Sequence, residues 1–256
     1  IIKLQRQAIE DLNRHGRLLA VSQATRDFHI RQGIEATKCF TAFNGVDLSE
    51  YRPQSSLGYL HRELGLSARA RFIAVIGQLG PRKGTDVALT AALRVISAAP
   101  NAHWIIVGER TSHKEESCVF ERRLHSLAAE SPLTGRVHFL GSREDIPSLL
   151  NECELLVHAA RQEPLGRVLL EAAATGLAVV ATNVGGTREI FPSEGDGAVL
   201  VPPENHSAMA EAILELLRND NRRQAIAAGG RRRAQKAFGI RQATLRLVEH
   251  YQSALI

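Results

Sequence analysis

The sequence Glu163-Pro-Leu-Gly-Arg-Val-Leu-Leu-Glu171, which continues as Ala-Ala-Ala-Thr-Gly176, is the most informative part of this 256-residue chain. Its leucines and alanines favour a helix over about residues 165–175, and Gly176 is a suitable residue to end it. Pro164 suits the first turn of such a helix, because the N–H that proline lacks has no partner there. Gly166 has no side chain, so a ligand could approach the backbone closely at that point.

The start of this helix would suit a negatively charged ligand. The first N–H groups of a helix are unpaired and together carry about half a positive charge, so they would hold a phosphate placed before Gly166. Glu171 would lie about 9 Å along the axis, where it could accept hydrogen bonds from two neighbouring hydroxyls such as those of a ribose. Glu163, in the preceding loop, would face another part of the ligand. An ordinary buried helix with a glutamate near its start is the alternative.

This pattern resembles the E-x7-E signature of retaining, nucleotide-sugar-dependent glycosyltransferases of family 4, also called group 1, which have the GT-B fold. The resemblance implies that Glu163 faces the donor sugar and that Glu171 binds the ribose of the nucleotide. It also implies that the backbone between them meets the diphosphate. The donor-binding residues implied within this motif are Pro164, Leu165, Gly166, Arg167 and Glu171.

From residue 71 onward, apolar strands alternate with helices. The expected strands cover residues 72–76, 102–107, 136–140, 154–158, 177–181 and 198–201, and the expected helices between and after them cover 85–98, 114–130, 144–151, 187–191, 205–218, 220–237 and 240–255. Because the strands are apolar on both faces, they predict a Rossmann-like parallel sheet with helices on both sides, an α/β fold. Ligands of such sheets bind at the carboxyl ends of the strands.

A glycine-rich segment, Gly77-Gln-Leu-Gly-Pro-Arg-Lys-Gly84, follows the first of these strands. Gly77 and Gly80 would allow a tight turn and a close approach to a ligand. Arg82 and Lys83 supply cations that could balance a diphosphate, although a turn with surface charge is the alternative.

The resembled family has an arginine after the first glycine of this segment and a lysine before the last, and both hold the donor phosphates. Lys83 matches that pattern. Gln78 stands where the arginine is usual. A neutral amide cannot replace that charge, so either Arg82 takes it over or the activity is altered.

Three other positions follow or end a predicted strand. Arg143 would lie near the base in the resembled fold, with a surface arginine as the alternative. The segment Asn183-Val-Gly-Gly-Thr-Arg-Glu-Ile190 resembles the G-G-x-x-E loop beside the family's donor site, and a flexible helix start is the alternative. His158, in an apolar strand, is interpreted as a core histidine with satisfied hydrogen bonds.

The first 70 residues are organised differently. They predict a helix over 1–15, a strand over 17–21, a helix from Ser22 to about residue 32, and a strand over 38–43 that Asn44-Gly45 ends. This piece is too small to cover both faces of a sheet. In the resembled family, the sequences matched by Ala20-Val-Ser22 and Asn44-Gly-Val-Asp47 mark the end of the N-terminal domain.

These observations give a domain division. We expect residues 1–43 to be the end of an N-terminal, acceptor-side domain, 44–70 an interdomain linker, and 71–238 the donor-binding domain. Residues 239–256 would form a helix that crosses back to the N-terminal domain. The chain opens at Ile1 in the middle of an amphipathic pattern, so we expect an upstream part to be missing.

Composition narrows the possible partners. A net charge of +5 suits an anionic ligand or a membrane surface, while 5% aromatic residues without a basic stripe argue against nucleic acid. The basic segment 222–236 predicts a solvated helix face, with contact to an anionic membrane as the alternative. No apolar run approaches 18 residues, and no signal peptide is apparent. Three widely spaced cysteines fit a reducing compartment, so we expect a cytoplasmic protein, with peripheral membrane contact as a further hypothesis.

The resemblance therefore predicts transfer of a sugar, with retention, from a UDP-, GDP- or ADP-linked donor to an unknown sugar, lipid or polysaccharide acceptor. Glu163, Arg82 and Lys83 would be the catalytic residues. No metal or other cofactor is expected, because no Asp-x-Asp motif occurs. Two alternatives stay open: another GT-B enzyme such as a nucleotide-sugar 2-epimerase, and a non-catalytic nucleotide-sugar-binding module. We expect this chain alone to bind donor and to transfer sugar poorly or not at all.

Overall fold

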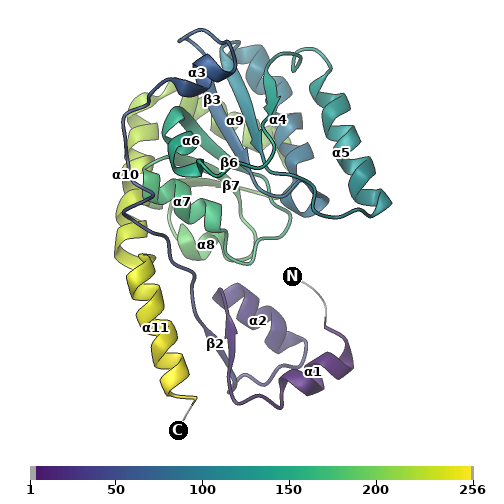
Figure 1. Cartoon of the computed structure of the whole chain (residues 1–256), viewed down its shortest axis with the longest axis vertical. Helices are drawn as coiled ribbons and strands as arrows, with labels where there is room; N and C mark the ends of the chain where they lie inside the picture. The colour runs from purple at the N-terminus through teal and green to yellow at the C-terminus, as the bar shows by residue number, and fades with distance from the viewer. Residues whose placement is uncertain (1–3, 255–256) are drawn as a thin grey trace.

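Six apolar segments form one parallel sheet in the computed structural model of the chain, which describes residues 4–254 (Figure 1). The strands are β3 (Arg71–Ile76), β4 (Ala102–Val107), β5 (Val137–Phe139), β6 (Cys153–His158), β7 (Ala178–Thr182) and β8 (Ala198–Val201). Their order across the sheet is β5-β4-β3-β6-β7-β8, so the direction of winding reverses between β3 and β6. In sheets of this kind, the crevice for a ligand opens at that reversal.

Helices cover both faces of the sheet. One face carries α4 (Thr85–Ala98), α5 (Glu115–Ala128) and α9 (His206–Arg218), and the other carries α3 (Tyr59–Glu63), α6 (Ile146–Glu152), α7 (Arg167–Thr175) and α10 (Asp220–Ala237). Successive residues of a strand point to opposite faces of the sheet. Ile73 packs against the layer of α4 and α9, and Phe72 packs against the opposite layer. The predicted parallel sheet covered on both sides is confirmed.

The central helix α7 begins two residues later than the sequence predicts. Gly166 has a left-handed backbone (φ 103°), and a Cβ atom there would lie 2.6 Å from Leu169 Cδ1. Such a residue cannot belong to a right-handed helix, so the helix starts at Arg167. Pro164 therefore lies in the loop before the helix, and not in its first turn as predicted. Gly176 ends the helix as predicted.

The start of the chain forms a small unit with its own two-stranded parallel sheet. It consists of α1 (Arg6–Leu12), β1 (Leu18–Ala20), α2 (Gln23–Arg31) and β2 (Cys39–Thr41). Ser22 caps α2 as predicted, since its hydroxyl accepts a hydrogen bond from the N–H of Thr25 at 3.0 Å. Residues 1–3 of the predicted first helix lie outside the described residues.

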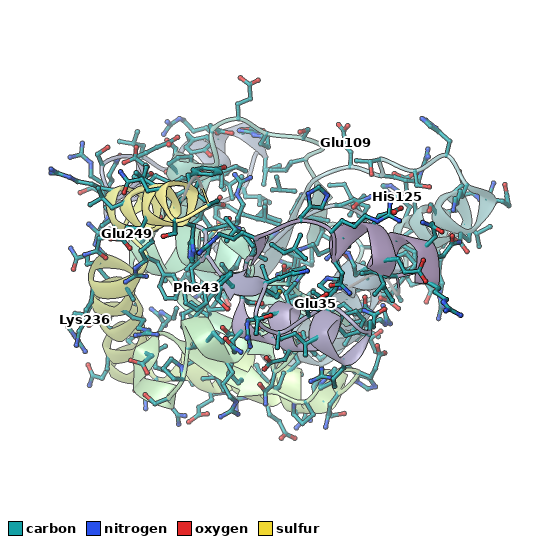
Figure 2. All side chains as sticks on the ribbon, turned by 90° about the horizontal axis from the view of Figure 1, so that it is seen from below. Glu35, Phe43, Glu109, His125, Lys236 and Glu249 are labelled. Carbon is teal, nitrogen blue, oxygen red and sulfur yellow. The ribbon has the colours of Figure 1, made fainter. Side chains whose placement is uncertain are left out.

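The last helix, α11 (Ile240–Gln252), runs beside this N-terminal unit (Figure 1). The guanidinium of Arg17 lies 4.1 Å from the ring centroid of Phe40 and 2.9 Å from His250 Nδ1 on α11. Phe43, labelled in Figure 2, packs edge-on against Phe238 with ring centroids 5.6 Å apart. The N-terminal unit is therefore in contact with the C-terminal part of the chain. After β2, a long strap over residues 44–58 leads to α3, a short helix that the sequence analysis did not predict.

Several arginines of α10 have a structural role. Arg231 donates hydrogen bonds to the carbonyls of Tyr51 (2.9 Å) and Ala174, and Arg233 donates to that of Ile190 (3.1 Å). The predicted solvated face is thus wrong for these two side chains, because they hold backbone carbonyls of neighbouring segments. Within residues 4–254, no helix is both long and apolar enough to cross a membrane.

Candidate functional site

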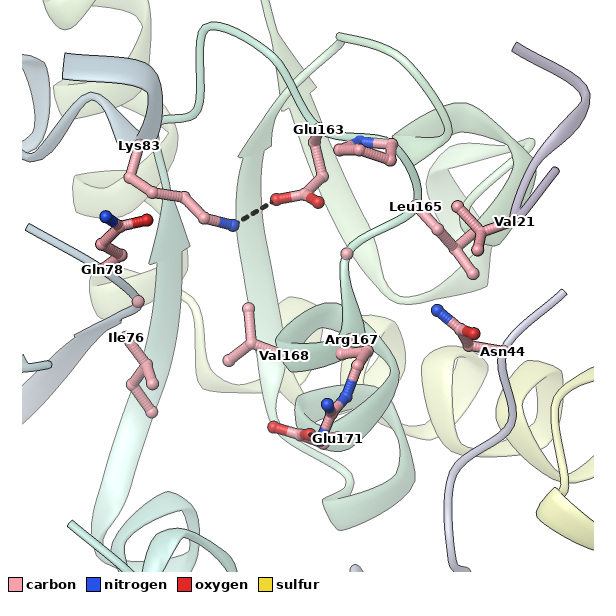
Figure 3. A pocket seen from close by; sticks show the side chains of 13 residues that line it. Val21, Asn44, Ile76, Gln78, Lys83, Glu163, Leu165, Arg167, Val168 and Glu171 are labelled. Atoms are coloured by element: carbon pink, nitrogen blue, oxygen red, sulfur yellow. Dashed lines mark hydrogen bonds and ion pairs between the residues drawn. The ribbon is translucent and has the colours of Figure 1, made fainter. Parts of the chain in front are cut away.

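A pocket of about 390 Å³ opens at the carboxyl ends of β3 and β6, where the strand order reverses (Figure 3). The loop after β3 and the loop and helix after β6 form most of its wall. Two residues of the N-terminal region lie on the other side of the opening. The lining residues are Val21, Asn44, Ile76, Gly77, Gln78, Lys83, Glu163, Pro164, Leu165, Gly166, Arg167, Val168 and Glu171.

Two polar groups meet on one oxygen of Glu163. Lys83 Nζ lies 2.6 Å from Glu163 Oε2, and the two side chains point at each other across the pocket wall (Figure 3). His158 Nε2, at the end of β6, lies 2.8 Å from the same oxygen. Glu163 is only 6% exposed, so these contacts replace most of the water that a carboxylate would otherwise bind.

The environment keeps Glu163 ionised. Burial alone would raise the pKa of this carboxyl, but the hydrogen bond from His158 and the charge of Lys83 outweigh it and lower the pKa to about 2. Burial lowers the pKa of His158, against the opposing effect of Glu163, so the imidazole is neutral at neutral pH. At that pH, the cation that faces Glu163 is thus Lys83.

The backbone of the Glu163 loop is held by the loop after β7. The N–H of Gly186 donates to the carbonyl of Glu163 at 3.0 Å. Gly185 has a left-handed backbone (φ 52°), and a Cβ atom there would lie 1.9 Å from the same carbonyl oxygen, so only glycine fits. This is the segment that resembles the G-G-x-x-E loop, and it does lie beside the pocket.

The glutamate of that segment joins the N-terminal unit to the sheet domain. Glu189 accepts hydrogen bonds from the N–H groups of Gln23 (2.7 Å) and Ala24 (2.8 Å), the first residues of α2. A carboxylate at a helix N-terminus satisfies otherwise unpaired donors and is favoured by the helix dipole. Thr25 Oγ1 also donates to the carbonyl of Pro164 at 3.3 Å. These contacts hold the N-terminal unit against the sheet domain, so that Val21 lines the pocket.

The loop after β3 is tied to the loop after β6 through Arg161. Its N–H donates to the carbonyl of Arg82 (2.9 Å), and its guanidinium donates to Pro81 O (2.6 Å) and pairs with Asp86 (2.9 Å). Lys83 follows directly in the same loop. Arg161 therefore fixes the distance between the two loops that carry Lys83 and Glu163.

Glu171 lies at the far end of the pocket, on α7. Its side chain is 15% exposed, and burial raises its pKa. Arg167, one turn earlier, lies 3.8 Å away with a largely exposed guanidinium, so this ion pair is weak. Burial and the charge of Glu171 together raise the pKa of Tyr51 to about 12. The carboxylate thus has acceptor capacity that faces the pocket.

Most of the sequence-predicted residues line this pocket, and three do not. Gly80 has an extended backbone outside it, and Arg82 turns to the carbonyl of Gln162 at 3.2 Å. Arg143 forms ion pairs with Glu63 (2.6 Å) and Asp145 (2.8 Å) on the α3 and α6 side. These three residues, which were predicted to act on the nucleotide sugar, therefore lie outside the pocket that the other predicted residues line.

Gln78 is at the pocket, but its amide Nε2 donates to Thr111 Oγ1. Neither Gln78 nor Arg82 therefore provides a cation in the pocket at the position where an arginine is usual. Lys83 is the only buried or half-buried cation among the lining residues.

The sequence analysis missed several lining residues and one buried partner. Val21 and Asn44 stand within the two short motifs that it assigned to a domain boundary, and their position just after β1 and β2 was the available signal. Ile76 and Val168 line the pocket as apolar ends of predicted elements. His158 is a buried histidine with a satisfied hydrogen bond, as predicted, and the partner that the sequence did not indicate is Glu163.

Among residues 4–254, no group of three or more histidine, cysteine, aspartate or glutamate side chains could hold a metal ion. The charged side chains that line the pocket are those of Lys83, Arg167, Glu163 and Glu171. Together with the start of α7, they offer a cationic end for an anion and a carboxylate end for hydroxyl groups.

The fold and this pocket define a doubly wound nucleotide-binding-type domain with its site at the reversal of strand order. The sequence profile of the family described as "Glycosyl transferases group 1" matches residues 60–233. The chain belongs to this family. Its sheet domain is similar to the C-terminal domain of a group 1 family glycosyl transferase (LpcC) from Francisella tularensis, with 25% identity and a TM-score of 0.68 over 77% of this chain and 100% of that one.

Longer proteins resemble almost the whole chain. The mannosyltransferase LpsB of lipopolysaccharide core biosynthesis from Rhizobium meliloti is 28% identical over 83% of this chain. The Anabaena protein Alr3699/HepE, solved in complex with UDP-glucose, has 27% identity and a TM-score of 0.90 over 97% of this chain, so the arrangement is that of GT-B proteins. The chain spans 60% of the length of LpsB and 67% of that of HepE.

Proposed function

We propose that this chain is the donor-binding part of a retaining glycosyltransferase that takes its sugar from a nucleotide-diphosphate sugar. The observation that carries the proposal is the single pocket that Lys83, Glu163, the start of α7 and Glu171 share. Its cationic end suits a diphosphate, and its carboxylate end suits a ribose. The HepE complex with UDP-glucose supports a donor of this class.

Each residue then has a role in the proposal. As the bond between the sugar and the diphosphate breaks, negative charge grows on the leaving phosphate. Lys83 and the N–H groups at the start of α7 would stabilise that charge, which is the work that a metal ion does in other enzymes. Glu163 would orient the sugar by accepting hydrogen bonds from its hydroxyls, and Glu171 would accept those of the ribose.

Three of the predicted roles need revision within this proposal. Arg82 and Arg143 have partners outside the pocket, so we assign them to loop structure in the state described here. Gly80 keeps only a role in the shape of the loop. Arg167, which is exposed beside the pocket, is the remaining side-chain cation for the second phosphate.

The acceptor would bind to a part of a longer protein that faces this pocket. We propose the same domain division as above, with boundaries after residues 43, 70 and 238. The contact between Arg17 and His250 of α11 supports the part in which the last helix returns to the N-terminal unit. The three thiols are unpaired, which supports a reducing compartment such as the cytoplasm. Contact with an anionic membrane or a lipid acceptor is a further part of the proposal. Arg231 and Arg233 of α10 would contribute little to it, because they donate hydrogen bonds to backbone carbonyls.

Calorimetry tests the proposal directly. The chain is titrated with UDP, GDP and ADP in a buffer that contains EDTA, beside Glu171→Ala and the exposed control Glu211→Ala. We expect micromolar binding of one nucleotide that is lost in Glu171→Ala and kept in Glu211→Ala. Absence of binding for all three nucleotides by the wild-type chain would contradict the proposal.

A non-catalytic nucleotide-sugar-binding module is the second candidate, and Gln78 is the observation that favours it. The neutral amide removes a cation at the phosphate end of the pocket. In the full-length protein, Gln78→Arg should raise sugar transfer if the protein is an enzyme limited by this position. Transfer that stays at zero in both forms, while the nucleotide sugar still binds, would favour the binding module. Release of a free or epimerised sugar without acceptor would instead indicate the 2-epimerase alternative.

A further inference from the structure

His158 is the last residue of β6 and is 3% exposed. Its imidazole does not line the pocket, because it lies behind Glu163 on the side of the sheet. Both His158 Nε2 and Lys83 Nζ contact Glu163 Oε2, at 2.8 and 2.6 Å. Among the described residues, Glu163 Oε1 has no hydrogen-bond partner. The carboxylate is therefore held by one oxygen, and the other is left for a ligand.

The direction of the hydrogen bond follows from the two protonation states. An ionised carboxylate only accepts hydrogen bonds, so Nε2 of His158 must carry the proton and donate it. A neutral imidazole adds no charge, so the negative charge of Glu163 is balanced by Lys83 alone. A second lysine at this position would add another positive charge beside the phosphate end of the pocket. The neutral imidazole holds the carboxylate without adding that charge.

The second donor matters because the last torsion of a glutamate is weakly restricted. A lysine ammonium is a flexible point charge that follows the carboxylate when it turns. The ring of His158 is fixed by the packed strand, with Val157 and Ala159 buried on either side. His158 is a rigid donor on the strand and Lys83 is a mobile donor on the loop. Because both donate to the same oxygen, they fix the orientation of the Glu163 carboxylate.

We infer that His158 is a positioning residue: through its Nε2–H it holds Glu163 so that Oε1 faces the sugar of the bound donor. The inference rests on the proposed function of the pocket. It predicts that His158 affects recognition of the sugar, and not of the nucleotide, because its side chain is hydrogen-bonded to Glu163 and not to Glu171. A histidine that only fills the core would affect overall stability and would leave the preference for the sugar unchanged.

The test compares binding of a nucleoside diphosphate with binding of its sugar-linked form. UDP and UDP-glucose, GDP and GDP-mannose, and ADP and ADP-glucose are titrated into the wild-type chain, and the pair that binds is used for the variants. His158→Phe keeps the ring and removes the donor. His158→Gln places an amide N–H near the position of Nε2, and His158→Asn is too short to reach Glu163.

For His158→Phe and His158→Asn, we expect binding of the free diphosphate to stay within about twofold of the wild type. The preference for the sugar-linked form should fall about tenfold, as for one hydrogen bond to a charged group. His158→Gln should restore most of the preference. If the phenylalanine variant does not fold, the asparagine and glutamine variants form the comparison.

The pH dependence gives a readout that a packing role would not move. Without its donor, Glu163 keeps Lys83 as its stabilising partner, with Arg82 as the next cation near this part of the site, so its pKa rises. The preference for the sugar-linked form should then weaken at a higher pH in His158→Phe than in the wild type. Nitrogen-15 NMR at pH 7 should show the wild-type imidazole neutral and protonated at Nε2.

The outcomes separate the two claims. If the wild-type chain binds no pair, the proposed function is overturned and the inference with it. If the wild type binds a pair and all three variants keep its preference for the sugar-linked form, only the inference is overturned. A wild-type imidazole that is protonated at Nδ1 would also overturn the inference, because Nε2 could not then donate to Glu163.

Discussion

Replacement of Lys83 by methionine should destabilise the fold by leaving a buried carboxylate with one partner fewer. The side chain of Glu163 is 7% exposed and that of Lys83 is 18% exposed, so water replaces the lost ion pair poorly. Methionine keeps the apolar stem of lysine, which packs beside Gly77. The substitution therefore removes the charge and little of the packing.

The magnitude follows from the pKa of Glu163, which is lowered from 4.5 to about 2. At about 1.4 kcal/mol for each tenfold change in the protonation equilibrium, the interactions of the ionised form are worth about 3 kcal/mol. His158 and Lys83 share this stabilisation, so we expect Lys83→Met to lower the free energy of unfolding by about 1–2 kcal/mol. For a chain of this size, Tm would fall by about 2–8 °C.

The effect should depend on pH in a defined direction. A carboxyl with a lowered folded-state pKa contributes stability that is complete above its unfolded pKa of 4.5 and is lost as the pH falls towards 2. The deficit of Lys83→Met should therefore be complete at pH 7 and smaller at pH 3. Urea denaturation followed by circular dichroism at both pH values measures it.

The matched control is Arg94→Met. Arg94 pairs with Glu211 at 2.9 Å, but the two side chains are 54% and 63% exposed, so we expect a change within about 0.5 kcal/mol. Equal deficits for Lys83→Met and Arg94→Met at pH 7 would refute the reasoning. A deficit of the same size at pH 3 as at pH 7 would assign it to packing of the lysine stem.

Other perturbations of the site have equally definite outcomes. Gly185→Ala should destabilise the fold by at least about 2 kcal/mol in urea denaturation, because its Cβ would lie 1.9 Å from the Glu163 carbonyl, whereas Gly80→Ala, which meets no atom within 4 Å, should match the wild type. Glu189→Ala should increase amide exchange in α2 about tenfold without affecting α4, since two N–H groups lose their acceptor; equal exchange in both forms would contradict this. Nucleotide affinity should decline as the pH falls through the raised pKa of Glu171, and a constant affinity from pH 7 to pH 4 would show that its charge plays no part.

The sheet could be predicted from the sequence because its strands are short apolar runs, and this signal is local. The segment over 102–107 is buried at every position, and the strand has the predicted bounds. The start of α7 could not be predicted to the residue, because the backbone conformation of Gly166 depends on the packing of Leu169 below it. The short helix α3 gave too weak a periodic signal over five residues.

Charged side chains were predicted less well than backbone motifs. Arg143 is committed to Glu63, which lies 80 positions earlier in the sequence, so no local pattern could show that its guanidinium is engaged. The same distance in sequence separates Arg82 from Gln162. His158 is close to Glu163 in the chain, but their contact depends on a loop that folds back over the end of β6.

The loop that carries Glu163 is shaped by main-chain groups. Gly185 and Gly186 contact the carbonyls of Glu163 and Pro164, and Arg161 binds the opposite loop through backbone oxygens. Main-chain contacts of this kind survive when a side chain is exchanged. If the proposed function holds, positions 162, 164 and 165 can therefore change to fit a different sugar while Glu163 and the frame stay unchanged, provided that the two glycines and Arg161 are kept. In a selection for new donor preferences, productive substitutions should accumulate in the loop, and the residues of the frame should stay fixed.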